Sequence, residues 1–405
     1  MTEFGLDALH ALKGDALVLR WGKKVGDHVA LIDGGPDTVY RTSIVPHLEA
    51  LAGTDHLGKP NPIVLDLVVV SHVDDDHIQG IIDLANAIDR AEQQAKPRPI
   101  QVDEVWHNTF EDLAFLADFA NEPELVQAIK DAAASPQSLA SAAAVPKADP
   151  TVGDITAGVQ NVSQGRALDR ILRTIKLPRN ERFATRGGFA RDGRLIKLHG
   201  LTVRVLAPNT ELLELLKGEW RKELGKILKK EADKRKAGIS ALAAAFDDPS
   251  VPNQSSIVMH VTFGGKTMLL TGDARGDHLL DALRPKAGAK PKPMHVDLLK
   301  VPHHGSNHSN DAQLFGTITA DHYVISGNGA HGNPHPVALK ALFDTQAGRP
   351  ITVHLTDHPT VGAKTADHKK KAEAAQRVLD EAEKSQNVTI VYREDDATAV
   401  TVDLL

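Results

Sequence analysis

The stretch IVLDLVVVSHVDDDHIQG, residues 63–80, joins a run of apolar residues to a dense cluster of ionisable ones. Its first part has the nearly continuous apolar, β-branched character of a strand that is buried on both faces. Five of the six residues from 72 to 77 are then ionisable: His72, Asp74, Asp75, Asp76 and His77. Carboxylates this close together repel one another unless a cation neutralises them. We therefore expect a divalent metal site at the C-terminal end of a buried strand, because an exposed acidic turn does not explain the two bracketing histidines.

The spacing within this loop can serve two metal ions. In an extended chain, the side chains at positions 72 and 74 point to one side. A turn before positions 76 and 77 lets the second pair approach from another direction. Two cations held about 3.5–4 Å apart activate water and clamp an in-line displacement at phosphorus.

Other apolar, β-branched runs end at polar clusters in the same way and are predicted strands. They span residues 16–21, 29–33, 63–72, 201–208, 255–263, 267–273, 296–304, 322–329 and 351–355. Helical patterns lie between several of them, at residues 78–95, 277–285 and 336–344. Strands that alternate with helices predict a layered α/β fold. We expect a single domain over residues 1–405.

Two stretches are predicted to be insertions in that domain. Residues 109–190 contain helical pieces around an Ala/Ser/Pro-rich segment, whose composition is typical of a loop. Residues 209–246 form a long charged helix candidate, with nine Lys and Arg against four acids between positions 217 and 236. A solvated charged face is favoured over nucleic-acid contact there, since no aromatic ladder accompanies the charges. Both insertions offer a surface for a protein partner.

Composition limits the remaining possibilities. The chain has 405 residues, 41% of them hydrophobic and 25% charged, which is typical of an ordinary globular protein. Its formal charge of -6 gives no global attraction for polyanions. Because there is no cysteine, a metal must be held by histidine, carboxylate or amide groups. We see no secretory signal and no apolar run near the ~20 residues that span a bilayer, so we expect a soluble, cytoplasmic protein without membrane contact.

Five motifs in order carry a family resemblance. SHVDDDHIQG resembles the H-x-[HD]-x-D-H signature of the metallo-β-lactamase superfamily, with Asp at the second ligand position. The other stretches are KGDALVLRW, LIDGGP, MLLTGDA and VDLLKVPHHGSNHS, followed by SGNGAHGNPHP. Together they resemble the ComEC-type competence hydrolase domain and its soluble relatives. The resemblance implies an αββα sandwich of the metallo-β-lactamase type and two divalent metal ions.

The resemblance also implies a set of metal ligands. His72 and Asp74 serve one ion, and Asp76 and His77 serve the other. Asp273 ends a predicted strand, and its two carboxylate oxygens suit a bridging role. The expected ligands in order are His72, Asp74, Asp76, His77, Asp273 and His335, with His331 as the rival of His335 for the last place. Because oxygen ligands are numerous, manganese and magnesium compete with zinc.

The chain departs from the family pattern at two positions. Asn253 occupies the place of the middle histidine ligand, so one metal is labile or Asn253 holds substrate or water instead. Asn333 replaces the first histidine of the GHPHP pattern.

The remaining candidates surround the substrate. His303 and His304 follow another predicted strand, and we expect them, with Asp76, to be catalytic and the two histidines to protonate the leaving group. Ser306 and Asn307 can donate hydrogen bonds to phosphoryl oxygens, and Asn253 and His331 are further substrate-binding candidates. Asp15 and Asp33 are expected to support the metal-binding loop from behind rather than to bind metal.

These residues favour a binuclear metal-dependent hydrolase, a phosphodiesterase or nuclease that acts through a metal-bound hydroxide on nucleic acid or a nucleotide. A lactone, lactam or thioester hydrolase of the same superfamily is the first alternative. A catalytically weak, metal-stabilised binding scaffold is the second, and the asparagines at 253 and 333 favour it. The hydroxyl-rich loop at 303–309 favours phosphate over an acyl group because phosphate offers more oxygens.

Overall fold

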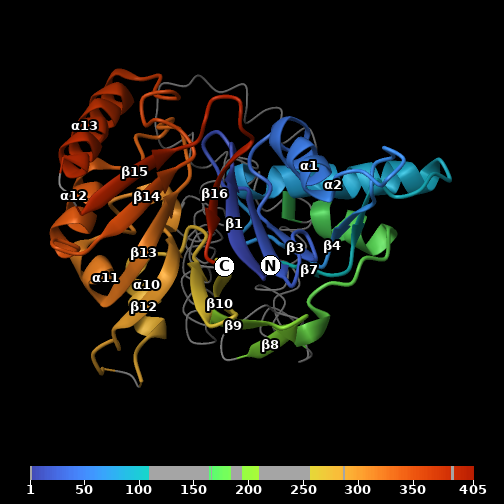
Figure 1. Ribbon diagram of the computed structural model, residues 1–405, viewed down its shortest axis with the longest axis horizontal. Helices are drawn as coiled ribbons and strands as arrows, with labels where there is room; N and C mark the ends of the chain where they lie inside the picture. Colours follow the sequence, from blue (N-terminus) through green and yellow to red (C-terminus); the bar gives the residue numbers. More distant parts are fainter. Residues whose placement is uncertain are drawn as a thin grey trace, which may run out of the picture.

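The computed structural model describes residues 2–108, 164–165, 167–183, 194–208, 256–285, 288–384 and 387–405. Two large sheets lie side by side, each with helices on its outer side (Figure 1). The predicted α/β class is confirmed. Asn253 and most of the segments 109–190 and 209–246 fall outside the described residues, so the division into one domain with two insertions stays a prediction.

The first sheet is mixed in direction. Its strands in spatial order are β16 (Ala399–Asp403), β1 (Glu3–Leu9), β2 (Leu17–Gly22), β3 (His28–Ile32), β5 (Leu67–Val69) and β7 (Val105–Trp106). Strands β16 to β3 pair antiparallel, whereas β3, β5 and β7 run parallel. The carboxyl ends of β3 and β5 therefore meet at one edge. Helices α1 (Val45–Ala52) and α2 (Asp75–Gln93) accompany this sheet, and a small parallel pair, β4 (Ile63–Leu65) and β6 (Ile100–Val102), adjoins it.

The second sheet has eight strands. In spatial order they are β15 (Val388–Tyr392), β14 (Ile351–Leu355), β13 (Ile318–Ile325), β12 (Met294–Lys300), β11 (Lys266–Leu270), β10 (Val258–Phe263), β9 (Leu201–Ala207) and β8 (Leu195–Leu198). Strands β11 to β15 are parallel to one another. Its helices are α10 (Gly276–Ala282), α11 (Ala312–Thr317), α12 (Pro336–Thr345) and α13 (Ala366–Glu383).

Three hydrophobic clusters hold these layers together. The central cluster contains residues of both sheets, among them Phe4 and Trp21 from the first and Met259 and Leu298 from the second. A second cluster joins the first sheet to α1 and α2, and a third joins the second sheet to α10 through α13. Because alternate side chains of a strand face opposite sides, each sheet supplies one face to the central cluster and the other face to its helices.

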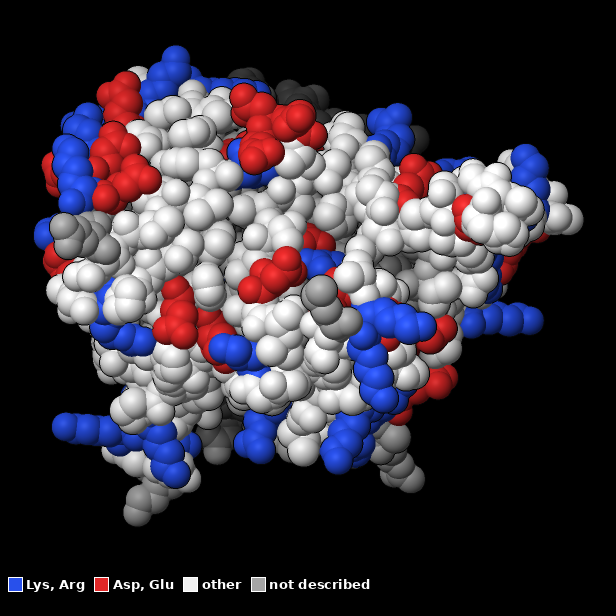
Figure 2. Space-filling view, in the orientation of Figure 1, with Lys and Arg blue, Asp and Glu red and all other residues white. Residues whose placement is uncertain are grey.

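Two helices show how the polar faces are arranged. Helix α13 buries Ala372, Ala375 and Leu379, and charged side chains of both signs cover its outer side, at the upper left of Figure 2. Residues 167–174 are helical and bury Leu168 and Leu172 in the cluster that contains α2, so this described part of the segment 109–190 packs on the core. Within the described ranges, no helix combines the length and apolar character needed to cross a membrane.

Helix α2 makes a close backbone contact with the loop after β3. Its buried residues recur with helical spacing, including Ile78, Ile81, Ala85 and Ile88. A Cβ atom on Gly80 would lie 2.0 Å from the backbone oxygen of Gly34, in the loop after β3. Only a glycine fits there, and the close contact fixes the first turn of α2 against that loop.

Candidate metal centre

The polar side chains singled out in the sequence follow the strands that run parallel. Asp33 directly follows β3, and His72 lies three residues after the end of β5. In the second sheet, Asp273 follows β11, and the pair His303 and His304 follows β12. Carboxyl ends of parallel strands form one edge of a sheet, so the fold brings these loops together.

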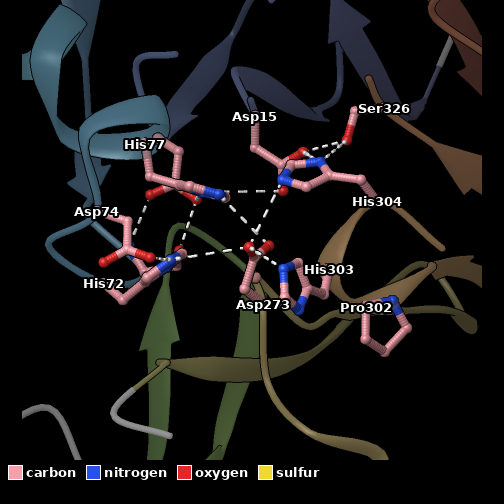
Figure 3. Close-up of polar contacts among 12 residues, drawn as sticks. Asp15, His72, Asp74, His77, Asp273, Pro302, His303, His304 and Ser326 are labelled. Atoms are coloured by element: carbon pink, nitrogen blue, oxygen red, sulfur yellow. Dashed lines mark hydrogen bonds and ion pairs between the residues drawn. The ribbon is translucent and has the colours of Figure 1, made fainter. Parts of the chain in front are cut away.

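Asp273 lies at the centre of the group (Figure 3). Its Oδ1 atom is 3.4 Å from Nε2 of His77. Its Oδ2 atom is 3.9 Å from Nε2 of His72, 3.5 Å from Nε2 of His304 and 3.7 Å from Nε2 of His303. One carboxylate from the second sheet therefore faces imidazoles that come from both sheets.

The atoms at this centre are buried and lack hydrogen bonds. The Nε2 atoms of His72, His77 and His304 and the Oδ1 atom of Asp273 have no hydrogen-bond partner within the described part of the chain. Buried polar atoms are almost always paired in folded proteins, and an orphan needs an explanation such as an ion. A divalent cation coordinated by these atoms satisfies all four.

The other nitrogen of each imidazole is already occupied. His77 Nδ1 is 2.9 Å from Asp33 Oδ2. His72 Nδ1 is 3.0 Å from Ser71 Oγ, and that hydroxyl donates to Asp33 Oδ2 at 2.6 Å, so the imidazole is the donor to Ser71. Both rings are thereby held in the tautomer that leaves Nε2 free to bind metal.

His304 follows the same pattern on the opposite side. Its Nδ1 atom is 3.3 Å from Oδ1 of Asp15, which also accepts a hydrogen bond from Ser326. Asp15 is fully buried and pairs with the fully buried Lys300, with 2.7 Å between Oδ2 and Nζ. Burial alone raises the pKa of Asp15, but the charges of Lys300 and His304 outweigh burial and lower it.

Electrostatics favour positive charge at this centre. Burial opposes ionisation of Asp273, yet His304, His77 and His303 hold its pKa well below the ordinary value. Burial lowers the pKa of His304, but Asp273 and Asp15 raise it to about 9. Burial also lowers the pKa of His77, but Asp273 and Asp33 outweigh it and raise this pKa well above its usual range. The acids thus stabilise the protonated, positively charged form of these imidazoles. A bound cation would supply the same positive charge beside the acids.

Two acids of the opening motif, Asp74 and Asp76, lie beside the imidazoles of this centre. Asp74 directly precedes α2, and its Oδ2 atom is 3.5 Å from Nε2 of His72. Asp76, in the first turn of α2, forms a group with His77 and His304 whose ligand atoms lie within 4.8 Å of one another. His72, His77 and Asp273 form another such group. The described residues therefore offer ligands on two sides of Asp273.

His303 and His304, which the sequence analysis treated alike, have different positions. His304 is buried in the ligand group, a place that the sequence analysis did not give it. The side chain of His303 remains 29% exposed, and its Nδ1 atom is 3.3 Å from Ser309 Oγ. Both residues have left-handed backbone conformations, with φ of 48° and 51°, which turn adjacent side chains in different directions.

The candidates near residue 335 do not join the group of Asp273. His335 precedes α12, where its Nδ1 atom accepts a hydrogen bond from Val337 N at 3.3 Å. His331 is exposed and interacts electrostatically with Asp76 and His304. Neither histidine belongs to a group of potential ligands within the described residues, so both ligand roles stay predictions.

The predicted substrate-binding residues also differ in exposure. Ser306 is buried, and its Oγ atom accepts a hydrogen bond from the backbone of His308 at 3.3 Å. Asn307 is exposed, and Asn253 lies outside the described residues.

Sequence reasoning did not single out Ser71, Lys300 or Ser326. A lysine inside the apolar run VDLLKVP was a usable signal, because a buried ammonium needs a buried acid as its partner.

Comparisons with known proteins give local or weak similarities. No family model matches the chain. Rat microtubule-associated protein 1A is 38% identical over 80 residues, which are 20% of this chain and 3% of that protein. ComE operon protein 3 of Bacillus subtilis is 29% identical over 103 residues, which are 25% of this chain and 13% of that protein. The matched regions thus span only a small part of these relatives.

Solved structures match more of the chain, but weakly. Unliganded yeast PDE1 gives a TM-score of 0.41 at 9% identity, with all of both chains covered. A protein of Parabacteroides distasonis described as a metal-dependent hydrolase gives a TM-score of 0.36 at 10% identity, covering 90% of this chain and 94% of that one. These scores do not establish a shared fold.

Proposed function

We propose that this chain is a binuclear metal-dependent hydrolase with a metallo-β-lactamase-type αββα sandwich, and that it cleaves phosphodiesters. One observation supports the metal centre above all. Three imidazoles from two distant parts of the chain direct unpaired Nε2 atoms at Asp273, while their Nδ1 atoms are held by Asp33, Ser71 and Asp15. Such outer partners orient the ligands of protein metal sites.

The arrangement supports two ions rather than one. Asp273 presents Oδ2 to His72 and His304 and Oδ1 to His77. The two proposed ligand sets are His72 with Asp74, and Asp76 with His77. Asp273 bridges the two sets in this proposal. Bound divalent cations would lower the pKa of water and stabilise negative charge on a phosphoryl group. Nitrogen and oxygen ligands together suit zinc or manganese, with magnesium as a further candidate.

The chain's own residues define the substrate side. Among the four imidazoles around Asp273, that of His303 is the most exposed, at 29%, and Ser309 helps to orient it. We place the leaving oxygen of the substrate beside His303, which can donate a hydrogen bond or a proton to it. Asn307 and His331, both exposed, are proposed to contact the phosphoryl oxygens or the remainder of the substrate. Nucleic acid and nucleotides are the substrate classes to be tried first.

The test is hydrolysis of bis-p-nitrophenyl phosphate by protein loaded with Mn²⁺ or Zn²⁺. Asp273→Ala removes the shared ligand and should lower turnover at least about 100-fold, or about 2.7 kcal/mol in the barrier. Asp277→Ala is the matched control, because Asp277 is an exposed acid on α10 that pairs with Arg275. It should retain the wild-type rate.

The alternatives give different outcomes in the same assay. Turnover of lactones or thioesters without turnover of phosphodiesters would favour the acyl hydrolase. Bound metal with no turnover of any of these substrates would favour the binding scaffold. Full phosphodiester turnover in Asp273→Ala would contradict the proposed centre.

A further inference from the structure

A second group of metal-ligand side chains lies at the opposite end of β3. His28 begins this strand, whereas Asp33, which supports the first centre, follows its last residue. Asp66 lies between β4 and β5, and His199 lies in the turn between β8 and β9, near the bottom of Figure 1. The ligand atoms of His28, Asp66 and His199 lie within 4.8 Å of one another.

The carboxylate of Asp66 is fixed in place and shared. Its Oδ2 atom accepts a hydrogen bond from the backbone of Val29 at 2.9 Å, and its side chain is only 10% exposed. Its Oδ1 atom is 3.0 Å from Nδ1 of His28 and 3.3 Å from Nε2 of His199. One buried oxygen therefore faces two imidazole nitrogens.

The two imidazoles stack on each other. Their ring centroids are 4.3 Å apart, with an interplanar angle of 10°. Because nearly parallel rings do not direct their in-plane lone pairs at one point, a shared ion requires the half-exposed ring of His199 to rotate out of the stack. His28 also stacks against Trp21, with ring centroids 5.5 Å apart and an interplanar angle of 24°. His199 belongs to a two-residue hairpin turn with Gly200, and both have positive φ, which fixes the direction in which His199 leaves the sheet.

We propose that His28, Asp66 and His199 bind a divalent transition-metal ion. Zinc bonds of about 2.0–2.1 Å in tetrahedral geometry place neighbouring ligand atoms about 3.3–3.4 Å apart, near the separations between Asp66 and the two imidazoles. Two imidazoles and one carboxylate suit zinc, nickel or copper better than magnesium. The side chain of His199 is 48% exposed, so water has access to a fourth position.

Such an ion would connect the two sheets. His28 and Asp66 belong to the first sheet and the connection into it, whereas the β8–β9 hairpin ends the second sheet. Metal held by both sides would stabilise the folded state, since the unfolded chain does not keep the three ligands together.

Trp21 provides a local reporter for the test. Metal-free full-length protein is titrated with Cu²⁺ while tryptophan fluorescence is recorded, and bound zinc is counted by equilibrium dialysis. The titrations use Asp273→Ala protein, so that the first centre contributes less, and are repeated with the native Asp273. In the Asp273→Ala protein and in the protein with the native Asp273, we expect Cu²⁺ to quench part of the tryptophan fluorescence. This quenching phase should disappear when Trp21→Phe is added.

In the His199→Ala protein, the affinity for Cu²⁺ in that quenching phase should fall at least about tenfold, which is the lower bound for the loss of supporting contacts at metal sites. The same protein should bind one zinc ion fewer in equilibrium dialysis. His56→Ala is the matched control, because His56 is also an exposed loop histidine, and it should behave like the parent protein. The proposal is overturned if His199→Ala keeps the parent affinity and zinc count, or if His56→Ala loses as much. Neither outcome depends on whether the first centre hydrolyses phosphodiesters.

Discussion

The imidazoles around Asp273 depend on the partners of their Nδ1 atoms. The Oδ2 atom of Asp33 is 2.9 Å from Nδ1 of His77. Asp33 also accepts two hydrogen bonds from Ser71, one from its backbone N–H at 2.7 Å and one from its hydroxyl at 2.6 Å. Ser71 in turn accepts from His72. A single buried carboxylate thus determines the tautomers of two proposed ligands.

Asp33→Asn should therefore weaken zinc binding about 10- to 100-fold, because an outer partner of two ligands is disturbed. The affinity is measured by competition with a chromophoric chelator. Asp37→Asn is the control, since Asp37 is exposed and accepts a hydrogen bond from the backbone of Thr38, away from the metal centre. Unchanged affinity in Asp33→Asn would show that His72 and His77 do not bind the metal.

At the same scale, the sequence predicted residue types better than their roles. The motif at 72–77 identified its acids and histidines because they are adjacent in the chain and follow a buried strand. The distinction between His303 and His304 was not available, because it depends on two left-handed backbone conformations that no local pattern encodes. The partner of Lys300 is Asp15, 285 positions away, and such pairs require the fold to be known.

At the scale of elements, the contact between α2 and the loop after β3 positions His77 and Asp76. Gly80→Ala would place a Cβ atom 2.0 Å from the backbone oxygen of Gly34. We expect a loss of about 1–3 kcal/mol in unfolding free energy, as in other overpacked sites, and weaker metal binding. Urea unfolding measures the first effect.

Gly316→Ala is the matched control for Gly80→Ala, since both glycines belong to helices. A Cβ atom on Gly316 would meet nothing within 4 Å, so alanine should leave stability unchanged or raise it slightly. Equal effects of the two substitutions would mean that α2 does not pack closely on the loop.

A second prediction at this scale concerns β1, β2, β16 and α1. Asp7 of β1 pairs with Arg20 of β2 at 2.7 Å, and Arg20 also pairs with Asp403 of β16 at 2.7 Å. His47 of α1 is 2.9 Å from Asp7. Burial raises the pKa of Asp7, but the hydrogen bond with His47 and the charge of Arg20 outweigh it and lower the pKa below its ordinary value of 3.8.

Because the folded pKa of Asp7 is depressed, its stabilising contribution is present above pH 3.8 and is lost as the pH falls through the folded value. Asp7→Asn should cost about 3 kcal/mol near pH 6, since it leaves Arg20 short of a buried partner. The difference from wild type should shrink below about pH 4. Urea unfolding at pH 3, 4 and 6 tests this, and a difference that does not change with pH would contradict the assignment.

At the scale of the whole molecule, the α/β class followed from the alternation of apolar runs, and the core strands of both sheets coincide with those runs. The strands β1, β6, β7, β8, β15 and β16 and the helices α1, α11 and α13 were not predicted. Of these strands, β7, β8, β15 and β16 lie at sheet edges, where the apolar pattern is short or diluted by charge, and α13 buries mostly alanines on its inner face. The convergence of strand ends at one edge was predictable because parallel strands share a direction, whereas the second group at His28 required the register of a distant hairpin.

The central claim is that the two sheets bring His72, His77, His304 and Asp273 together around divalent cations. Crystals of the protein grown with Zn²⁺ or Mn²⁺, measured on both sides of the metal absorption edge, test it most directly. We predict anomalous difference peaks within bonding distance of the three Nε2 atoms, with Asp273 between two peaks. A map with no peak among these side chains, although the crystal contains the metal, would contradict the account.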